Sequence, residues 1–103
     1  MPCAMKELIF NSRVYRDLEV ASEFYEMQDP GCGDYFNCSI IQDIKSLHRL
    51  HGIHRKFCGF HQMHATRFPF TIYYTVSETT IEVMGVLDQR RDPKWTRRQL
   101  LNR

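Results

Sequence analysis

Hydrophobic and polar residues alternate along the stretch Arg67–Val76, as they do in a strand that buries one face. The apolar positions are Phe68, Phe70, Ile72, Tyr74 and Val76. A period of two places them on one face. After the polar stretch Ser77–Thr80, a second run rich in β-branched residues continues to Asp88, and this arrangement predicts a β-hairpin. We expect the rest of the chain to cover one face of the hairpin and leave the other available.

The second strand of this hairpin is apolar on both faces, which is typical of a central strand. Strict alternation puts Val83, Gly85 and Leu87 on one face and Met84, Val86 and Asp88 on the other. Pro69 cannot donate a ladder hydrogen bond, so it belongs near a strand start or an edge. Two weaker strand candidates are the run 5–10 and the run 53–65, which Gly59 interrupts.

Two amphipathic helices are predicted ahead of the hairpin. In the first, apolar residues recur at spacings of four, three and four: Val14, Leu18, Ala21 and Tyr25. In the second, they are Phe36, Ile40, Ile44 and Leu47. The Pro- and Gly-rich segment 29–33 breaks the first helix, and Gly52 closes the second. Helices joined by so short a loop should form an antiparallel hairpin.

Length and composition indicate one globular domain over residues 1–103, with 43% hydrophobic and 13% aromatic residues. No apolar run approaches the roughly 20 residues that span a bilayer, and residues 1–10 do not resemble a signal peptide. We therefore expect a cytoplasmic protein without a membrane partner. Four cysteines lack a paired spacing and are interpreted as free, mostly buried thiols: Cys3, Cys32, Cys38 and Cys58.

Charge is unevenly distributed. Residues 1–50 hold five Lys and Arg against eight Asp and Glu, whereas residues 51–103 hold nine against four. Most of the excess lies at the end: Arg90, Arg91, Lys94, Arg97, Arg98 and Arg103. With Trp95 as a stacking face, this tail suits nucleic-acid contact; a solvated surface or a docking site for an acidic protein is the alternative. The segment 94–103 is short, and we expect it to be helical only when packed or bound.

The histidines are dense, but their spacing does not match a metal motif. They are His48, His51, His54, His61 and His64. Zinc needs converging ligands, and no Cys-x-x-Cys or His-Glu-x-x-His pattern is present. We expect no metal and no cofactor, although a small binding module that uses this cluster stays open. Glycine-rich phosphate loops and Gly-x-Ser-x-Gly elbows are also missing from the sequence.

Acid–base chemistry requires a titratable group beside an arginine that binds phosphate. Candidates are His54 with Arg55 and Lys56 before the hairpin, and Asp88 with Arg90 at its end. These two sets are far apart in sequence and could meet across a sheet face. The alternative is that Asp88 simply pairs with Arg90 or Arg91.

With these residues assembled, the chain resembles the RelE/ParE toxin superfamily. Three stretches carry the resemblance: Phe24-Tyr25-Glu26 with Gln28, Pro30, Gly31, Gly33 and Phe36; Arg67-Phe68-Pro69-Phe70 with Ile72-Tyr73-Tyr74; and residues 86–93 with Trp95. The resemblance implies an α+β fold, in which an N-terminal strand and a helical hairpin pack on a small, mainly antiparallel four-stranded sheet with a basic C-terminal tail. It also implies a type II toxin–antitoxin or plasmid-stabilisation module, with a cognate antitoxin as partner and a homodimer left open.

The resemblance further implies two modes of growth inhibition, by poisoning DNA gyrase or by cutting mRNA on the ribosome. Thr71 and Asp88 depart from the residues typical of the ribonuclease branch, which favours gyrase-type or non-catalytic inhibition. For a ribonuclease, Arg90 would stabilise phosphate charge, and His54 or Asp88 would transfer protons. The residues assigned to substrate binding are Arg55, Lys56, Arg67, Arg91 and Trp95. A degenerate toxin that only binds its antitoxin is a further alternative.

Overall fold

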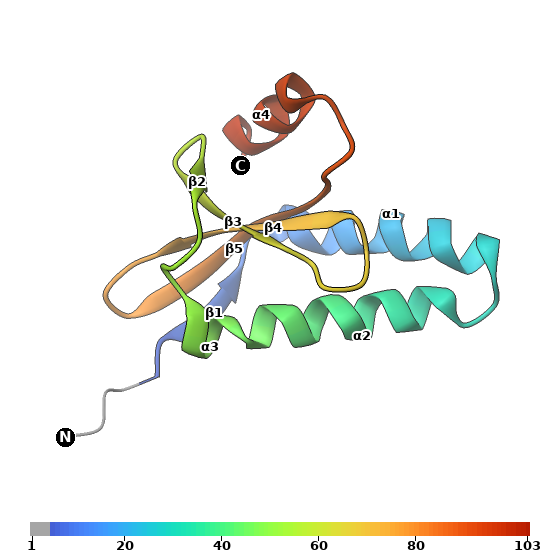
Figure 1. Cartoon of the computed structure of the whole chain (residues 1–103), viewed down its shortest axis with the longest axis horizontal. Helices are drawn as coiled ribbons and strands as arrows, with labels where there is room; N and C mark the ends of the chain where they lie inside the picture. Colours follow the sequence, from blue (N-terminus) through green and yellow to red (C-terminus); the bar gives the residue numbers. More distant parts are fainter. Residues whose placement is uncertain (1–4) are drawn as a thin grey trace.

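The computed structural model describes residues 5–103, which form a mixed sheet with helices on both faces (Figure 1). The elements are β1 (Glu7–Phe10), α1 (Ser12–Gln28), α2 (Cys32–Lys45), α3 (Leu47–Leu50), β2 (Lys56–Phe57), β3 (Phe60–His64), β4 (Phe70–Val76), β5 (Thr80–Asp88) and α4 (Pro93–Leu101). The predicted α+β class, helical hairpin and final β-hairpin are all present.

The sheet has five strands in the order β1-β5-β4-β3-β2, so the expectation of four strands was wrong. The extra strand is β2, which pairs antiparallel with β3 through Lys56 and Phe57. Cys58 and Gly59 turn the chain between them with φ of 55° and 85°. Two consecutive residues with positive φ suit a tight hairpin turn, so Gly59 forms a turn where an interruption was expected. β1 runs parallel to β5, which makes the sheet mixed.

The helical hairpin lies on one face of the sheet and buries the predicted apolar positions. Val14, Phe36, Ile40, Ile44 and Leu47 are almost completely buried against β4 and β5. At the tip, the Glu26 carboxylate accepts hydrogen bonds from the backbone N–H groups of Gly31 and Gly33. A Cβ at Gly33 would lie 2.7 Å from the carbonyl oxygen of Ser22, so only glycine lets α1 and α2 approach this closely.

A β-bulge in β5 changes which residues face the helices. Tyr73 pairs with Gly85 and Tyr74 pairs with Val83, so Met84 is the extra residue. Strict alternation was therefore wrong beyond Val83. Val83 and Val86 both lie in the core under the helical hairpin, and Leu87 lies in the cluster on the opposite face.

The opposite face of the sheet is covered by α4, contrary to the expectation that this face stays available. Figure 1 shows α4 lying over this face. Leu100 and Trp95 pack against Tyr73 and Leu87. The Asp92 side chain caps the helix by accepting a hydrogen bond from the N–H of Lys94, and Pro93 occupies the first turn. The basic tail is thus a packed helix.

Two further expectations concern membrane segments and cysteines. No helix in residues 5–103 is long and apolar enough to cross a bilayer. The described cysteines are free thiols, but Cys38 is exposed and Cys32 and Cys58 are only half-buried, so the expectation that they are mostly buried was wrong. Cys3 lies outside the described residues.

Candidate functional site: two cavities beside the C-terminal helix

A groove of about 350 Å³ lies between α1, the end of β5 and α4, and it carries much of the predicted site. Apolar side chains line most of it: Val20, Ala21, Phe24, Tyr25, Phe70, Val86, Leu87 and Trp95. Arg16, Arg90 and Arg91 line it with positive charge. The groove therefore combines an apolar surface with a cationic rim.

The charged groups of this groove are partly neutralised within the chain. Arg90 Nε donates to Asp88 Oδ1 at 3.0 Å, and Arg90 Nη2 donates to Asp88 Oδ2 at 2.8 Å. The hydrogen bond from Arg90 is the main cause that holds the pKa of Asp88 below its ordinary value. The structure thus contains the ion pair of Asp88 with Arg90, which was the alternative to acid–base chemistry. Arg91 makes no such pair within residues 5–103, and its guanidinium stacks 4.0 Å from the centre of the Trp95 ring.

A second, smaller cavity of about 160 Å³ lies on the sheet face beside α4. Polar side chains from three elements meet there. His64 Nδ1 lies 3.1 Å from Thr71 Oγ1 and 3.0 Å from Gln89 Oε1. With the Gln89 amide oxygen as acceptor, Nδ1 carries the hydrogen and Nε2 is left as a base. Tyr73 and Arg91 also line this cavity, and burial raises the pKa of the Tyr73 hydroxyl.

Sequence reasoning weighed His64 as a metal ligand, as part of a small binding module or as a surface or hydrogen-bonding histidine, and never as a catalytic base, so this arrangement was missed. Register explains why these residues meet: His64 pairs with Thr71, and Gln62 pairs with Tyr73 across β3 and β4. In a strand, Gln62 and His64 share a face, as do Thr71 and Tyr73. A period-two reading of both strands together would have grouped these four side chains.

His54 does not meet the proposed partners at the end of β5. Its Nδ1 forms a 2.5 Å hydrogen bond with the Tyr74 hydroxyl, which also accepts from the N–H of Gly52. Burial, the largest cause, lowers the pKa of His54. Tyr74 lies four residues along β4 from Phe70, the partner of Asp88, which is about 13 Å in a strand. The two sets, which could have met across a sheet face, are therefore separate.

Other predicted substrate-binding residues are also outside the two cavities. Arg55 and Lys56 are exposed, at the β2 edge of the sheet, and Arg67 is exposed in the loop between β3 and β4. Arg90, Arg91, Asp88 and Trp95 line the groove.

Within residues 5–103, no three His, Cys, Asp or Glu side chains are grouped so that they could hold a metal ion.

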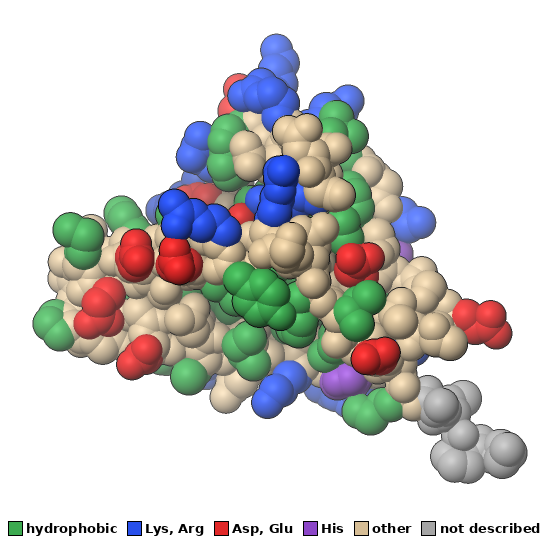
Figure 2. Space-filling view, turned by 180° about the vertical axis from the view of Figure 1, so that it is seen from behind, with side chains coloured by type: hydrophobic (Ala, Val, Ile, Leu, Met, Phe, Trp, Pro, Cys, Tyr) green, Lys and Arg blue, Asp and Glu red, His purple; other side chains and the backbone are tan. Residues whose placement is uncertain are grey.

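Positive and negative charge separate along the surface. Figure 2 shows Lys and Arg side chains gathered around α4 and acidic side chains along the helical hairpin. The acidic residues of the hairpin include Glu19, Glu23, Glu26, Asp29 and Asp34. The positive charge of the second half is thus concentrated around α4, and Figure 2 also shows acidic side chains away from the hairpin.

The observed fold has the α+β class that the sequence resemblance implies. It is similar to a chain of the solved structure described as "Chromosomal ParDE TA system from P. aeruginosa", with a TM-score of 0.73 and 19% sequence identity. The match covers 82% of this chain and 96% of that chain. No protein-family model matches the sequence, and neither does any curated protein.

Proposed function

We propose that this chain is the toxin component of a bacterial type II toxin–antitoxin module, of the kind that acts in plasmid stabilisation. The observation that carries the proposal is the likeness of nearly the whole fold to a chain of a ParDE toxin–antitoxin system. Within this proposal, a cognate antitoxin holds the toxin inactive, and the free toxin stops growth by acting on DNA gyrase or on translation.

The groove beside α1 supports an antitoxin as the partner. Val20 and Phe24, which line it, are about half exposed, and Met27 is 87% exposed on the same side of α1. An apolar stripe of this kind marks an interaction surface. A partner segment with apolar side chains for the stripe and a carboxylate for Arg91 would be complementary to it.

Non-catalytic inhibition is the favoured mode, because the predicted catalytic groups do not form a centre. Asp88 is held ionised by Arg90, which makes it a weak base, and His54 is hydrogen-bonded to Tyr74 elsewhere. A gyrase inhibitor needs only a binding surface. Arg91, Trp95 and the exposed cations of α4 offer one.

The second cavity favours one alternative, an mRNA endoribonuclease. His64 Nε2 would remove the proton of a 2′-hydroxyl, whose oxygen attacks the adjacent phosphate and forms a 2′,3′-cyclic phosphate. The bond from phosphorus to the 5′-oxygen breaks, and that oxygen leaves with a proton from water, while Arg91 would stabilise the charge that develops on the phosphate. The hydrogen bonds that His64 Nδ1 forms with Thr71 Oγ1 and Gln89 Oε1 hold the imidazole orientation that this step requires. His64 replaces His54 and Asp88 as the candidate base.

The test is expression under tight induction without an antitoxin, with DNA and protein synthesis pulse-labelled separately as growth stops. Early loss of DNA synthesis supports the gyrase mode, and early loss of protein synthesis with cleaved mRNA supports the ribonuclease. The double variant Arg90→Ala/Arg91→Ala should abolish inhibition while it still folds. Arg49→Ala, which removes an exposed cation from α3, is the matched control.

The proposal fails if soluble, folded wild-type protein does not affect growth. A degenerate toxin that only binds an antitoxin, or a small binding module, would then be the better description. His64→Gln separates the two modes: it should abolish mRNA cleavage in a ribonuclease and leave gyrase inhibition unchanged.

A further inference from the structure

Residues 52–55, which connect α3 to β2, are attached to the sheet through the hydroxyl group of Tyr74. The Gly52 N–H donates to this oxygen at 3.1 Å, and His54 Nδ1 lies 2.5 Å from it. The Tyr74 side chain is completely buried, whereas the residues of the connection other than His54 are exposed. His54 is therefore the side chain that fixes this connection to β4.

The Tyr74 hydroxyl also determines the protonation state of His54. A tyrosine hydroxyl has one hydrogen to donate. Its oxygen accepts the Gly52 N–H, and all three groups are satisfied when the hydroxyl hydrogen is donated to His54 Nδ1. His54 is then neutral, with its own hydrogen on Nε2. A proton on Nδ1 would turn this acceptor into a donor, and the Tyr74 hydroxyl hydrogen would have no acceptor among the described residues.

His61 also contacts the connection, but protonation affects its contact differently. Its Nδ1 donates to the carbonyl oxygen of His54 at 2.7 Å, and its ring stacks on the Tyr74 ring with centres 5.0 Å apart. Because Nδ1 of His61 already carries a hydrogen, a second proton would go to Nε2. The hydrogen bond to the His54 carbonyl would stay intact. Of the two histidines, only His54 therefore loses its contact when it is protonated.

The surroundings of His54 oppose a positive charge on its ring. Burial and the neighbouring histidines His61 and His64 lower the pKa of His54 below its ordinary value of 6.5. Within residues 5–103, no carboxylate forms a hydrogen bond or salt bridge with His54. The titratable and charged groups on the surrounding elements are His51 after α3, Arg55 and Lys56 at β2, His61 and His64 on β3, and Tyr74 on β4.

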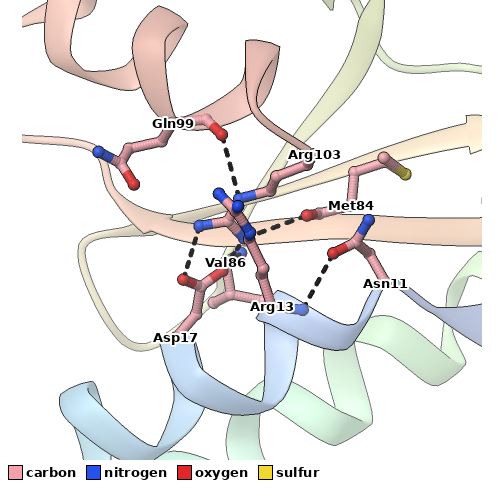
Figure 3. A network of polar contacts seen from close by, with 7 residues as sticks. All are labelled: Asn11, Arg13, Asp17, Met84, Val86, Gln99 and Arg103. Carbon is pink, nitrogen blue, oxygen red and sulfur yellow. Dashed lines mark hydrogen bonds and ion pairs between the residues drawn. The ribbon is translucent and has the colours of Figure 1, made fainter.

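A second polar network that joins distant segments contains no histidine (Figure 3). In it, Arg103 pairs with Asp17, and Asp17 Oδ2 also accepts from the N–H of Val86 at 3.0 Å. Histidine is the side chain that ordinarily changes its charge between pH 5 and 8. This network therefore serves as an internal reference for effects of pH that do not involve His54.

Strand β2 follows the connection directly, and its position depends on it. β2 pairs with β3 through only two residues, and just before them the Arg55 carbonyl accepts from the N–H of Gln62 at 2.8 Å. Phe57 of β2 lines the cavity that contains His64, where its ring centre lies 6.4 Å from that of Tyr73. Release of the connection would therefore move one wall of this cavity.

We propose that His54 and Tyr74 form a pH-sensitive clasp, which holds residues 52–57 on the sheet while His54 is neutral and releases them when it is protonated. The sign follows from linkage. Because the pKa of His54 is lowered in the closed state, the released state binds the proton more tightly and gains population as pH falls below 6.5. The closed state is favoured above that pH. The clasp depends on these contacts alone, and only its effect on activity in the cavity depends on the proposed function.

NMR of the whole chain from about pH 8 to about pH 5, the range in which histidine titrates, tests the clasp. The amides of Gly52 and Gln62 should lose their protection from hydrogen exchange as the His54 ring becomes protonated. The Val86 amide, which donates to Asp17, should keep its protection over the same range. If Gly52 stays equally protected while His54 titrates, the clasp is overturned.

Two variants separate His54 from its neighbour. In His54→Gln, which cannot be protonated, the protection of Gly52 should no longer depend on pH, whatever level it takes. His61→Gln is the matched control and should retain the pH-dependent loss, with a midpoint at higher pH because one positive neighbour of His54 is removed. A pH dependence that survives in His54→Gln, or that disappears in His61→Gln, would assign the effect to another group. The wild-type titration decides the question even if a variant does not fold, and none of these measurements requires the chain to be a toxin.

Discussion

Arg90 and Asp88 form a two-point ion pair at the end of β5, although only one residue separates them in the chain. The strand ends at Asp88, and the turn that follows brings the guanidinium back onto the carboxylate. The N–H of Arg90 donates to the same carboxylate at 2.8 Å. A residue pair that suggested acid–base chemistry is therefore a local structural element at the rim of the groove.

The first prediction concerns the titration of Asp88. Since Arg90 lowers the pKa of Asp88 in the folded state, the stabilisation is present above the ordinary carboxyl pKa and is lost as pH falls through the lowered one. Arg90→Gln should raise the pKa of Asp88 toward its ordinary value of 3.8. Carboxyl-carbon NMR of both proteins measures this shift, with Arg98→Gln as control. An unchanged Asp88 titration in Arg90→Gln would contradict the assignment.

A second prediction follows from the buried Tyr74 hydroxyl. Tyr74→Phe removes the acceptor of the Gly52 N–H and the partner of His54, while it leaves the ring in the core. We expect a loss of about 1–3 kcal/mol in the free energy of unfolding, because the partly buried N–H of Gly52 and ring of His54 lose their partner. Urea denaturation measures it. The control is Tyr15→Phe, at a residue that is 64% exposed, which should change the stability little. An equal effect of both variants would show that the hydrogen bonds of the Tyr74 hydroxyl do not cause the loss.

The third prediction concerns Asp43, a buried carboxylate of α2 that fixes the loop before β4. Its oxygens accept hydrogen bonds from the N–H and the hydroxyl of Thr66, each at 3.0 Å. Asp43→Ala should lower the free energy of unfolding by about 1–3 kcal/mol, because the N–H of Thr66 loses its acceptor. Lys45→Ala, two residues further on the exposed side of the helix, is the control. Equal urea midpoints for the two variants would show that this contact is dispensable.

The fourth prediction compares two neighbouring arginines. Arg91 lines both cavities and forms no ion pair with another described residue, whereas Arg90 lines only the groove and is held by Asp88. Arg91→Ala should therefore weaken growth inhibition more than Arg90→Ala. If the activity is ribonucleolytic, loss of such a charge-stabilising group lowers cleavage by about 10²–10³-fold. The inducer concentration at which growth stops ranks the two variants by their toxicity. If Arg90→Ala is the less toxic variant, Arg91 is not part of the site.

Particular residues show how far sequence reasoning reached. The helical period of Val14, Leu18, Ala21 and Tyr25 and the two-residue period of β4 were sufficient to predict α1 and β4, because burial of one face is encoded locally. The same reasoning failed at Met84, since a bulge depends on how two strands pair. It also failed for β2, a strand of two residues, which is too short to show a period.

Sequence by itself determined the class of fold, the helical hairpin, the β-hairpin and the concentration of positive charge near the C-terminus. Only the tertiary structure decided which charged side chains form ion pairs, which face of the sheet α4 covers and which polar side chains lie together. His64, Thr71 and Gln89 converge through strand register and the turn after β5, and Asp17 meets Arg103 across 86 residues. The physical reason is separation along the sequence. Periodicity reflects which face of one element is buried, whereas these contacts depend on how segments far apart in the chain pack together.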